Sequence, residues 1–105
     1  MPQMPEEFEN IPSNIAKKVA KKKAQTATAE FQRSNYEGKA FNALNELREN
    51  NRLILESTDA KVKAKLNKSV IVLQTRISRF QSLIQKFEEK RFLYAQELLV
   101  LLRTI

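Results

Sequence analysis

Residues 66–105 read LNKSVIVLQTRISRFQSLIQKFEEKRFLYAQELLVLLRTI, and this stretch decides the fold. Its apolar residues alternate at spacings of four and three, which is typical of a helix that packs against other helices in a coiled-coil-like seam. Eleven of the twelve seam positions are apolar or aromatic. The seam comprises Leu66, Val70, Leu73, Ile77, Phe80, Ile84, Phe87, Arg91, Tyr94, Leu98, Leu101 and Ile105. The pattern predicts a long C-terminal helix over residues 59–104.

The composition of the remaining sequence also favours helix. Gly38 is the only glycine of the 105 residues, and all three prolines lie within the first twelve positions. A β-sheet protein of this size needs several turns with positive φ, which one glycine cannot supply. The chain is therefore predicted to be all-α.

The N-terminal third contains two different segments. Residues 1–12 carry three glutamates between prolines and show no helical period, so we expect an acidic extended arm there. A single helical domain is expected over 13–105, with Ser13 capping a first helix over 14–33. The apolar residues of this first helix form a narrow, mostly alanine face: Ile15, Val19, Ala20, Ala24, Ala27 and Phe31.

Two candidate breaks follow the first helix. Ser34 and Glu37 have the spacing of a capping box, which favours a new helix over 35–56. The sequence Ser-Thr-Asp at 57–59 offers a further stop, with Asp59 as the N-cap of the C-terminal helix. Two architectures stay open: a three-helix bundle if Ser34 breaks the helix, and a long antiparallel helical hairpin if it does not.

The last turns of the C-terminal helix are apolar on nearly all sides, because several apolar residues lie off the seam. Such a helix is normally buried on several sides. We expect a second subunit or a partner helix there, with the core of a compact monomer as the alternative. Arg91, the charged seam residue, either fixes the register or extends past the seam into solvent. The expected interface comprises Ile84, Phe87, Arg91, Phe92, Tyr94, Leu98, Leu99, Leu101, Leu102 and Ile105.

A formal net charge of +7 favours an acidic partner. Two lysine clusters, within residues 17–23 and 61–68, lie near expected helix N-termini, where the helix dipole disfavours cations. They are the expected site for an acidic partner, a nucleic-acid backbone being one candidate, and a solvated face is the alternative. A three-helix bundle would gather both clusters at one pole, whereas a hairpin would set the first cluster against Glu88, Glu89 and Glu97. The clusters are Lys17, Lys18, Lys21, Lys22 and Lys23, then Lys61, Lys63, Lys65 and Lys68.

Enzymatic chemistry finds little support in the sequence. The chain contains neither His nor Cys, and Asp59 is its only aspartate. We therefore expect no catalytic residues, no metal or cofactor site and no small-molecule substrate. The longest apolar run, 98–102, is far shorter than the ~20 residues that span a bilayer. A soluble, intracellular (cytoplasmic) protein without a membrane span is the resulting expectation.

Two stretches resemble known families. Residues 36–87 resemble helices two and three of a microtubule-interacting and trafficking domain, with Tyr36-Glu37 opening one helix and Arg76 among the residues in register on the next. That resemblance implies a three-helix, monomeric adaptor that binds a partner helix in an interhelical groove. The hexapeptide 11–16 resembles the opening of a helix in four-helix bundle proteins encoded in ribosomal RNA intervening sequences, which are similar to RNA-binding accessory proteins.

The residues themselves favour a non-enzymatic assembly or scaffolding protein. In this interpretation the protein self-associates through its C-terminal helix and contacts an acidic partner through its lysine clusters. The monomeric adaptor is the alternative.

Overall fold

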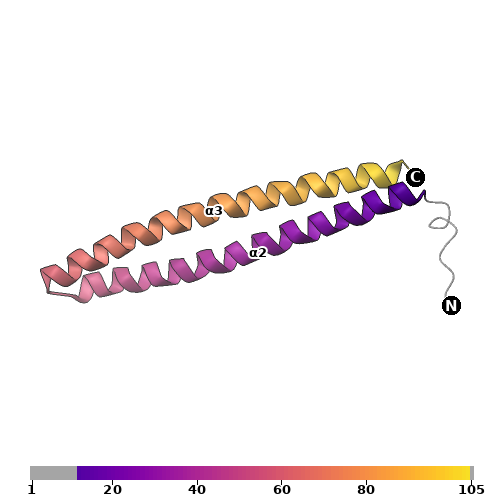
Figure 1. Ribbon diagram of the computed structural model, residues 1–105. Coiled ribbons are helices and arrows are strands. Elements are labelled where there is room, and N and C mark those ends of the chain that lie inside the picture. The colour runs from indigo at the N-terminus through magenta and orange to yellow at the C-terminus, as the bar shows by residue number, and fades with distance from the viewer. Residues whose placement is uncertain (1–11, 105) are drawn as a thin grey trace, which may run out of the picture.

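The computed structural model describes residues 12–104, which form two long antiparallel helices (Figure 1). Helix α2 spans Ser13–Glu56 and helix α3 spans Ala60–Arg103. A helix of 44 residues is ~66 Å long at 1.5 Å per residue, and the molecule is accordingly a rod of 74 × 27 × 15 Å. The predicted all-α class and the hairpin alternative are confirmed. The expected acidic arm, apart from Pro12, lies outside the described residues.

Helix α2 continues through the predicted break at Ser34. The three-helix prediction is therefore wrong for residues 12–104, and the expected helices 14–33 and 35–56 are one element. Glu37 does not cap a new helix, because residues 34–37 lie inside α2; its carboxylate lies 3.8 Å from Nε of Arg33 in the same helix. An exposed glycine such as Gly38 costs a helix only about 1 kcal/mol. Packing of the continuous helix against α3 outweighs that cost.

The second predicted break is confirmed, and Asp59 is the N-cap of α3. The backbone N–H of Lys61 donates to Oδ1 of Asp59 at 2.9 Å, and the N–H of Asp59 donates to Oγ of Ser57 at 3.2 Å. At the other helix start the prediction is wrong. The N-cap of α2 is Pro12, and Ser13 makes no capping hydrogen bond because it already lies in the helix.

We expect Asp59→Ala to lower the free energy of unfolding by about 1 kcal/mol, because an N–H at the start of α3 loses its acceptor. The neighbouring Thr58→Ala is the matched control and should change stability by less than about 0.5 kcal/mol. Urea unfolding followed by circular dichroism measures both. Equal losses for the two variants would show that the cap does not stabilise the turn.

The seam predicted from the heptad pattern is the face that α3 presents to α2. Leu73 is buried, with 3% of its surface exposed, and the other described seam residues are half-buried. Arg91 keeps its place on this face, with its Nε atom buried. The four-three spacing therefore located the packed face of α3 correctly over 66–101.

The packed face of α2 differs from the predicted alanine face. Ala20, Ala24 and Ala27 are exposed, and Phe31 is 70% exposed. The face that meets α3 follows the same four-three spacing but includes polar residues, whose aliphatic parts lie against the neighbouring helix. It comprises Ile15, Val19, Lys22, Thr26, Ala29, Arg33, Tyr36, Ala40, Ala43, Leu47, Asn50 and Ile54.

Small and large residues alternate along the face of α2 that meets α3. Ala43 lies beside Leu73 and Phe80. At the centre of the rod the ring of Tyr36 stacks on that of Phe87, with 5.8 Å between centroids and an interplanar angle of 9°. Alternation of small and large side chains lets two facing helices approach closely, and it explains why α2 needs few large apolar residues on its seam.

Candidate interaction surfaces

The hairpin places the two lysine clusters at opposite ends of the rod. Residues 17–23 lie in the first turns of α2, beside the C-terminal turns of α3, whereas 61–68 lie at the connection between the helices (Figure 1). A single basic pole, expected for three helices, therefore does not form. Lys63 is half-buried, while Lys61, Lys65 and Lys68 are exposed.

The first cluster is neutralised only in part. Lys22 forms an ion pair with Glu97 of α3, and its Nζ lies 5.3 Å from the centre of the Tyr94 ring. Lys22 therefore makes a contact between the two helices. The other four lysines of this cluster form no ion pair with any residue in 12–104.

An open hollow lies between the helices beside this cluster and has a volume of about 560 Å³. Lys18 and Lys21 line it from α2, while Leu93 and Val100 contribute from α3. Two further hollows follow along the seam. The second is lined by Lys21, Ala24, Gln25, Thr28, Ala29, Phe87, Lys90 and Tyr94. The third is lined by Lys39, Asn42, Ala43, Glu46, Leu73, Arg76 and Phe80.

These three hollows lie on one side of the seam. Residues seven apart form a row along a heptad helix, and Lys18, Gln25, Lys39 and Glu46 belong to one such row of α2. On α3, Arg76, Lys90 and Glu97 form the corresponding row, and Arg79 and Lys86 share a second row with Leu93 and Val100. We call this surface the basic side; its cationic residues are Lys18, Lys21, Lys39, Arg76, Arg79, Lys86 and Lys90.

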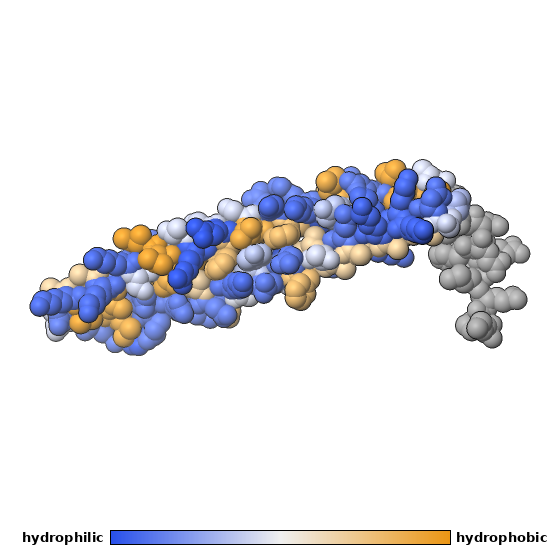
Figure 2. Space-filling model, in the orientation of Figure 1, coloured by the Kyte–Doolittle hydropathy of each residue, from blue (hydrophilic) through white to orange (hydrophobic). Residues whose placement is uncertain are grey.

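The opposite side of the seam carries more bulky apolar residues. Arg33 marks this side, because its side chain reaches both Glu37 and, at 3.9 Å, Glu88 of α3. The side chains of Phe41, Ile71, Phe92 and Leu99 are each more than half exposed. In the view of Figure 2, hydrophobic residues form separate patches among hydrophilic ones over both helices. We call this surface the apolar side; it comprises Phe41, Leu44, Leu55, Ile71, Phe92, Leu99 and Leu102.

The predicted interface residues divide into two groups. The seam members are half-buried against α2 within the same hairpin: Ile84, Phe87, Arg91, Tyr94, Leu98 and Leu101. The others are free for a further contact, since Phe92, Leu99 and Leu102 are 62%, 52% and 45% exposed. Ile105 lies outside the described residues. The heptad pattern identified both groups, but only the structure separates them.

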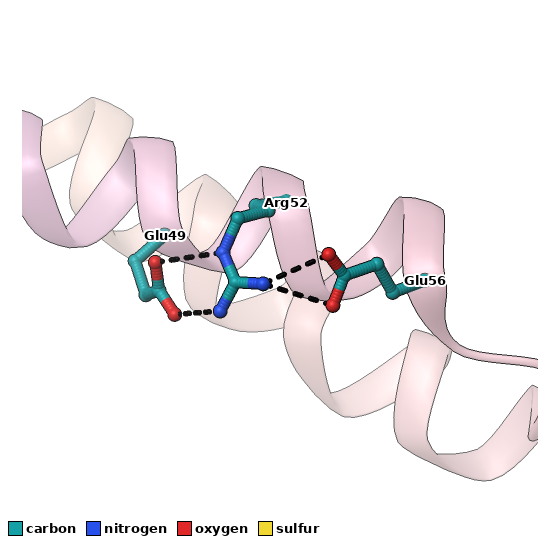
Figure 3. A network of polar contacts seen from close by, with 3 residues as sticks. All are labelled: Glu49, Arg52 and Glu56. Carbon is teal, nitrogen blue, oxygen red and sulfur yellow. Dashed lines mark hydrogen bonds and ion pairs between the residues drawn. The ribbon is translucent and has the colours of Figure 1, made fainter.

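The densest polar network lies in the last turns of α2 (Figure 3). Nε of Arg52 donates to Oε2 of Glu49 at 3.0 Å, and Nη1 donates to Oε1 of Glu56 at 2.8 Å. The hydrogen bond from Arg52 lowers the pKa of Glu49, and both carboxylates raise the pKa of Arg52. The three side chains satisfy one another, so this network stabilises the end of α2.

Within residues 12–104 no cluster of three or more His, Cys, Asp or Glu side chains has the geometry of a metal site. In the same range neither helix combines the length and apolar character needed to cross a membrane.

No known family model matches this chain. Comparison with curated proteins and with solved structures also found no similar protein. The three-helix architecture implied by the resemblance to a microtubule-interacting and trafficking domain is not found in residues 12–104. Any functional conclusion therefore rests on the residues and surfaces of the hairpin itself.

Proposed function

We propose that the protein is a non-enzymatic helical assembly protein that self-associates through the C-terminal half of α3. It contacts an acidic partner through lysines that form no ion pair within residues 12–104. The observation that supports this proposal is the small core of the hairpin. Among the described residues only Ala29, Ala43 and Leu73 are buried. A small domain gains its stability from buried apolar surface, and a second subunit supplies more of it.

The C-terminal turns of α3 supply the apolar surface for that subunit. Phe92 and Leu99 project on the apolar side, where Ala20 and Ala27 of α2 are also exposed. Phe92 and Leu99 are seven residues apart in α3, and Ala20 and Ala27 are seven apart in α2, so the same side of the hairpin carries one bulky row and one small row. A two-fold axis would set the bulky row of each copy against the small row of the other. This self-complementarity favours a second copy of the chain as the occupant.

The double variant Phe92→Gln/Leu99→Gln tests this proposal. We expect it to be monomeric at concentrations where the unchanged protein is oligomeric, because two exposed apolar side chains leave the interface. The matched control is Leu55→Gln/Ile71→Gln, which removes two exposed apolar side chains of the same side at the other end of the rod. Light scattering coupled to size exclusion gives the mass of each variant. Equal dissociation of both variants, or of neither, would contradict an interface in the C-terminal turns.

A further inference from the structure

We propose that the basic side binds the phosphodiester backbone of a nucleic acid, without reading its bases. This inference rests on the proposed contact with an acidic partner and names that partner, but it centres the contact on residues outside the two lysine clusters. The central residues are Arg76, Arg79, Lys86 and Lys90 of α3 and Lys39 of α2.

The first argument is the excess of positive charge along the middle of the basic side. Arg76, Arg79 and Lys86 are exposed, and none of them forms an ion pair within residues 12–104. Glu46 lines the third hollow with Lys39 and Arg76. An uncompensated row of cations attracts an anionic polymer and falls in affinity as salt screens it.

The second argument is how two of the lysines are held. Nζ of Lys39 lies 5.2 Å from the centre of the Tyr36 ring, and Nζ of Lys90 lies 5.5 Å from the centre of the Phe87 ring. The two rings belong to the stacked pair at the centre of the seam. Contact between an ammonium group and an aromatic face limits the side chain's freedom. Less entropy is therefore lost when these lysines bind a phosphate.

The third argument is the chemistry of the neighbouring polar residues. Gln25 and Thr28 lie beside Lys90 in the second hollow, and Asn42 lies beside Arg76 in the third. Gln, Thr and Asn side chains donate hydrogen bonds to phosphate and sugar oxygens in protein–DNA interfaces, where Arg and Lys supply the charge. The mixture on the basic side is therefore suited to a sugar-phosphate backbone.

The same surface fits an anionic membrane less well. A helix that lies on a lipid surface places large apolar side chains between its basic ones. The largely exposed apolar residues of α3 fall at Val62, Ile71 and Val72 and then from Phe92 onward. Ile71 and Val72 line a hollow beside Arg76 and Arg79, but no largely exposed apolar residue lies between Arg76 and Lys90. Binding there depends on charge and hydrogen bonds, which favours a nucleic acid over a bilayer.

The spacing of the cations suits an extended polyanion. Arg79 and Lys86 are seven residues apart, which is ~10.5 Å along a helix, and Arg76 and Lys90 are about twice as far apart. Duplex DNA carries one negative charge per ~1.7 Å of axis, so a phosphate is available near each cation. A straight rod touches only part of a helical turn, and we expect about three to five phosphate contacts per hairpin.

Binding of a labelled 20-base-pair duplex, as DNA and as RNA, at several salt concentrations tests the inference. The variant Arg76→Gln/Arg79→Gln/Lys86→Gln should bind about tenfold or more weakly than the unchanged protein at low salt. The slope of its log affinity against log salt concentration should be smaller in magnitude by about 2–3, since each lost phosphate contact lowers that slope by ~0.9. Glutamine keeps the helix propensity high, and circular dichroism verifies the helix content. Arg79→Gln/Lys86→Gln, which leaves the third hollow unchanged, should give the smaller effect of two lost contacts.

The matched control is Lys17→Gln/Lys23→Gln/Lys68→Gln, which removes the same charge from the two lysine clusters. We expect it to lower the salt slope by less than the basic-side variant does. If the cluster variant loses binding and the basic-side variant keeps it, the inference is overturned while the proposed acidic partner stands. Binding to vesicles of phosphatidylserine without binding to either duplex would also overturn it. Self-association, measured by light scattering on the same variants, should not change.

Discussion

Leu73→Ala is expected to lower the free energy of unfolding by about 2–5 kcal/mol, the usual cost of emptying a buried leucine site. Leu73 is the one large apolar side chain that is buried within residues 12–104, with 3% of its surface exposed. It lies beside Ala43 of α2 and Phe80 of α3. Ala43 is too small to fill the space that the leucine leaves.

The matched control for this variant is Ile71→Ala, two residues away in the same helix and 62% exposed. It removes a side chain of similar size from the surface, and its effect should be below about 1 kcal/mol. Urea unfolding at one fixed protein concentration measures both, since the stability of an oligomer depends on concentration. Similar losses for the two variants would contradict a seam centred on Leu73.

Asn35→Pro should lower the free energy of unfolding by about 3 kcal/mol or more, because α2 is continuous at this position. A proline inside a helix removes one backbone hydrogen bond and clashes with the carbonyl four residues earlier. If Ser34 were instead an N-cap, residue 35 would be the first residue of a new helix, where proline is favourable. The two architectures thus predict opposite results.

Ser13→Pro is the control for this second prediction. Ser13 is the first residue of α2 and makes no capping hydrogen bond. The preceding residue, Pro12, has φ −55° and ψ 138°, which is the conformation required before a proline. We expect Ser13→Pro to change stability by less than about 1 kcal/mol. A tolerated proline at position 35 would show that the helix breaks after Ser34.

The packed face of α3 and the connection between the helices could be predicted from the sequence. The seam of α3 could be located to the residue, because eleven of its twelve positions carry large apolar or aromatic side chains. The connection at 57–59 could be located because Asp59 has the chemistry of an N-cap. Both signals lie within short stretches of sequence. The seam is a repeated apolar spacing, and the cap supplies an acceptor to a backbone N–H that has none within the helix.

The packed face of α2 could not be predicted for a physical reason. Its seam includes Lys22, Arg33 and Asn50, which dilute the apolar period, while Phe31 lies on the exposed face. Asn50 is satisfied across the hairpin, where its Nδ2 donates to Oγ of Ser69 at 2.9 Å. Each of these polar seam residues has a partner in α3, so the sequence of α2 alone does not reveal which face is packed.

The candidate surfaces could not be predicted without knowing how the two helices are arranged. The lysine clusters are visible in the sequence, but the hairpin sends them to opposite ends of the rod. The basic side joins residues from two helices that run in opposite directions, such as Lys39 and Arg76. A seven-residue spacing of Arg79 and Lys86 was the signal present in the sequence, although it becomes meaningful only once the seam of α3 has been fixed.

The most direct test of the central claim is sedimentation equilibrium of the unchanged protein over a wide range of concentrations. Self-association through Phe92 and Leu99 predicts a mass of at least twice the 12.2 kDa of the chain, with dissociation on dilution. A mass of one chain at every concentration would contradict the account, because the exposed apolar turns of α3 would then remain in solvent.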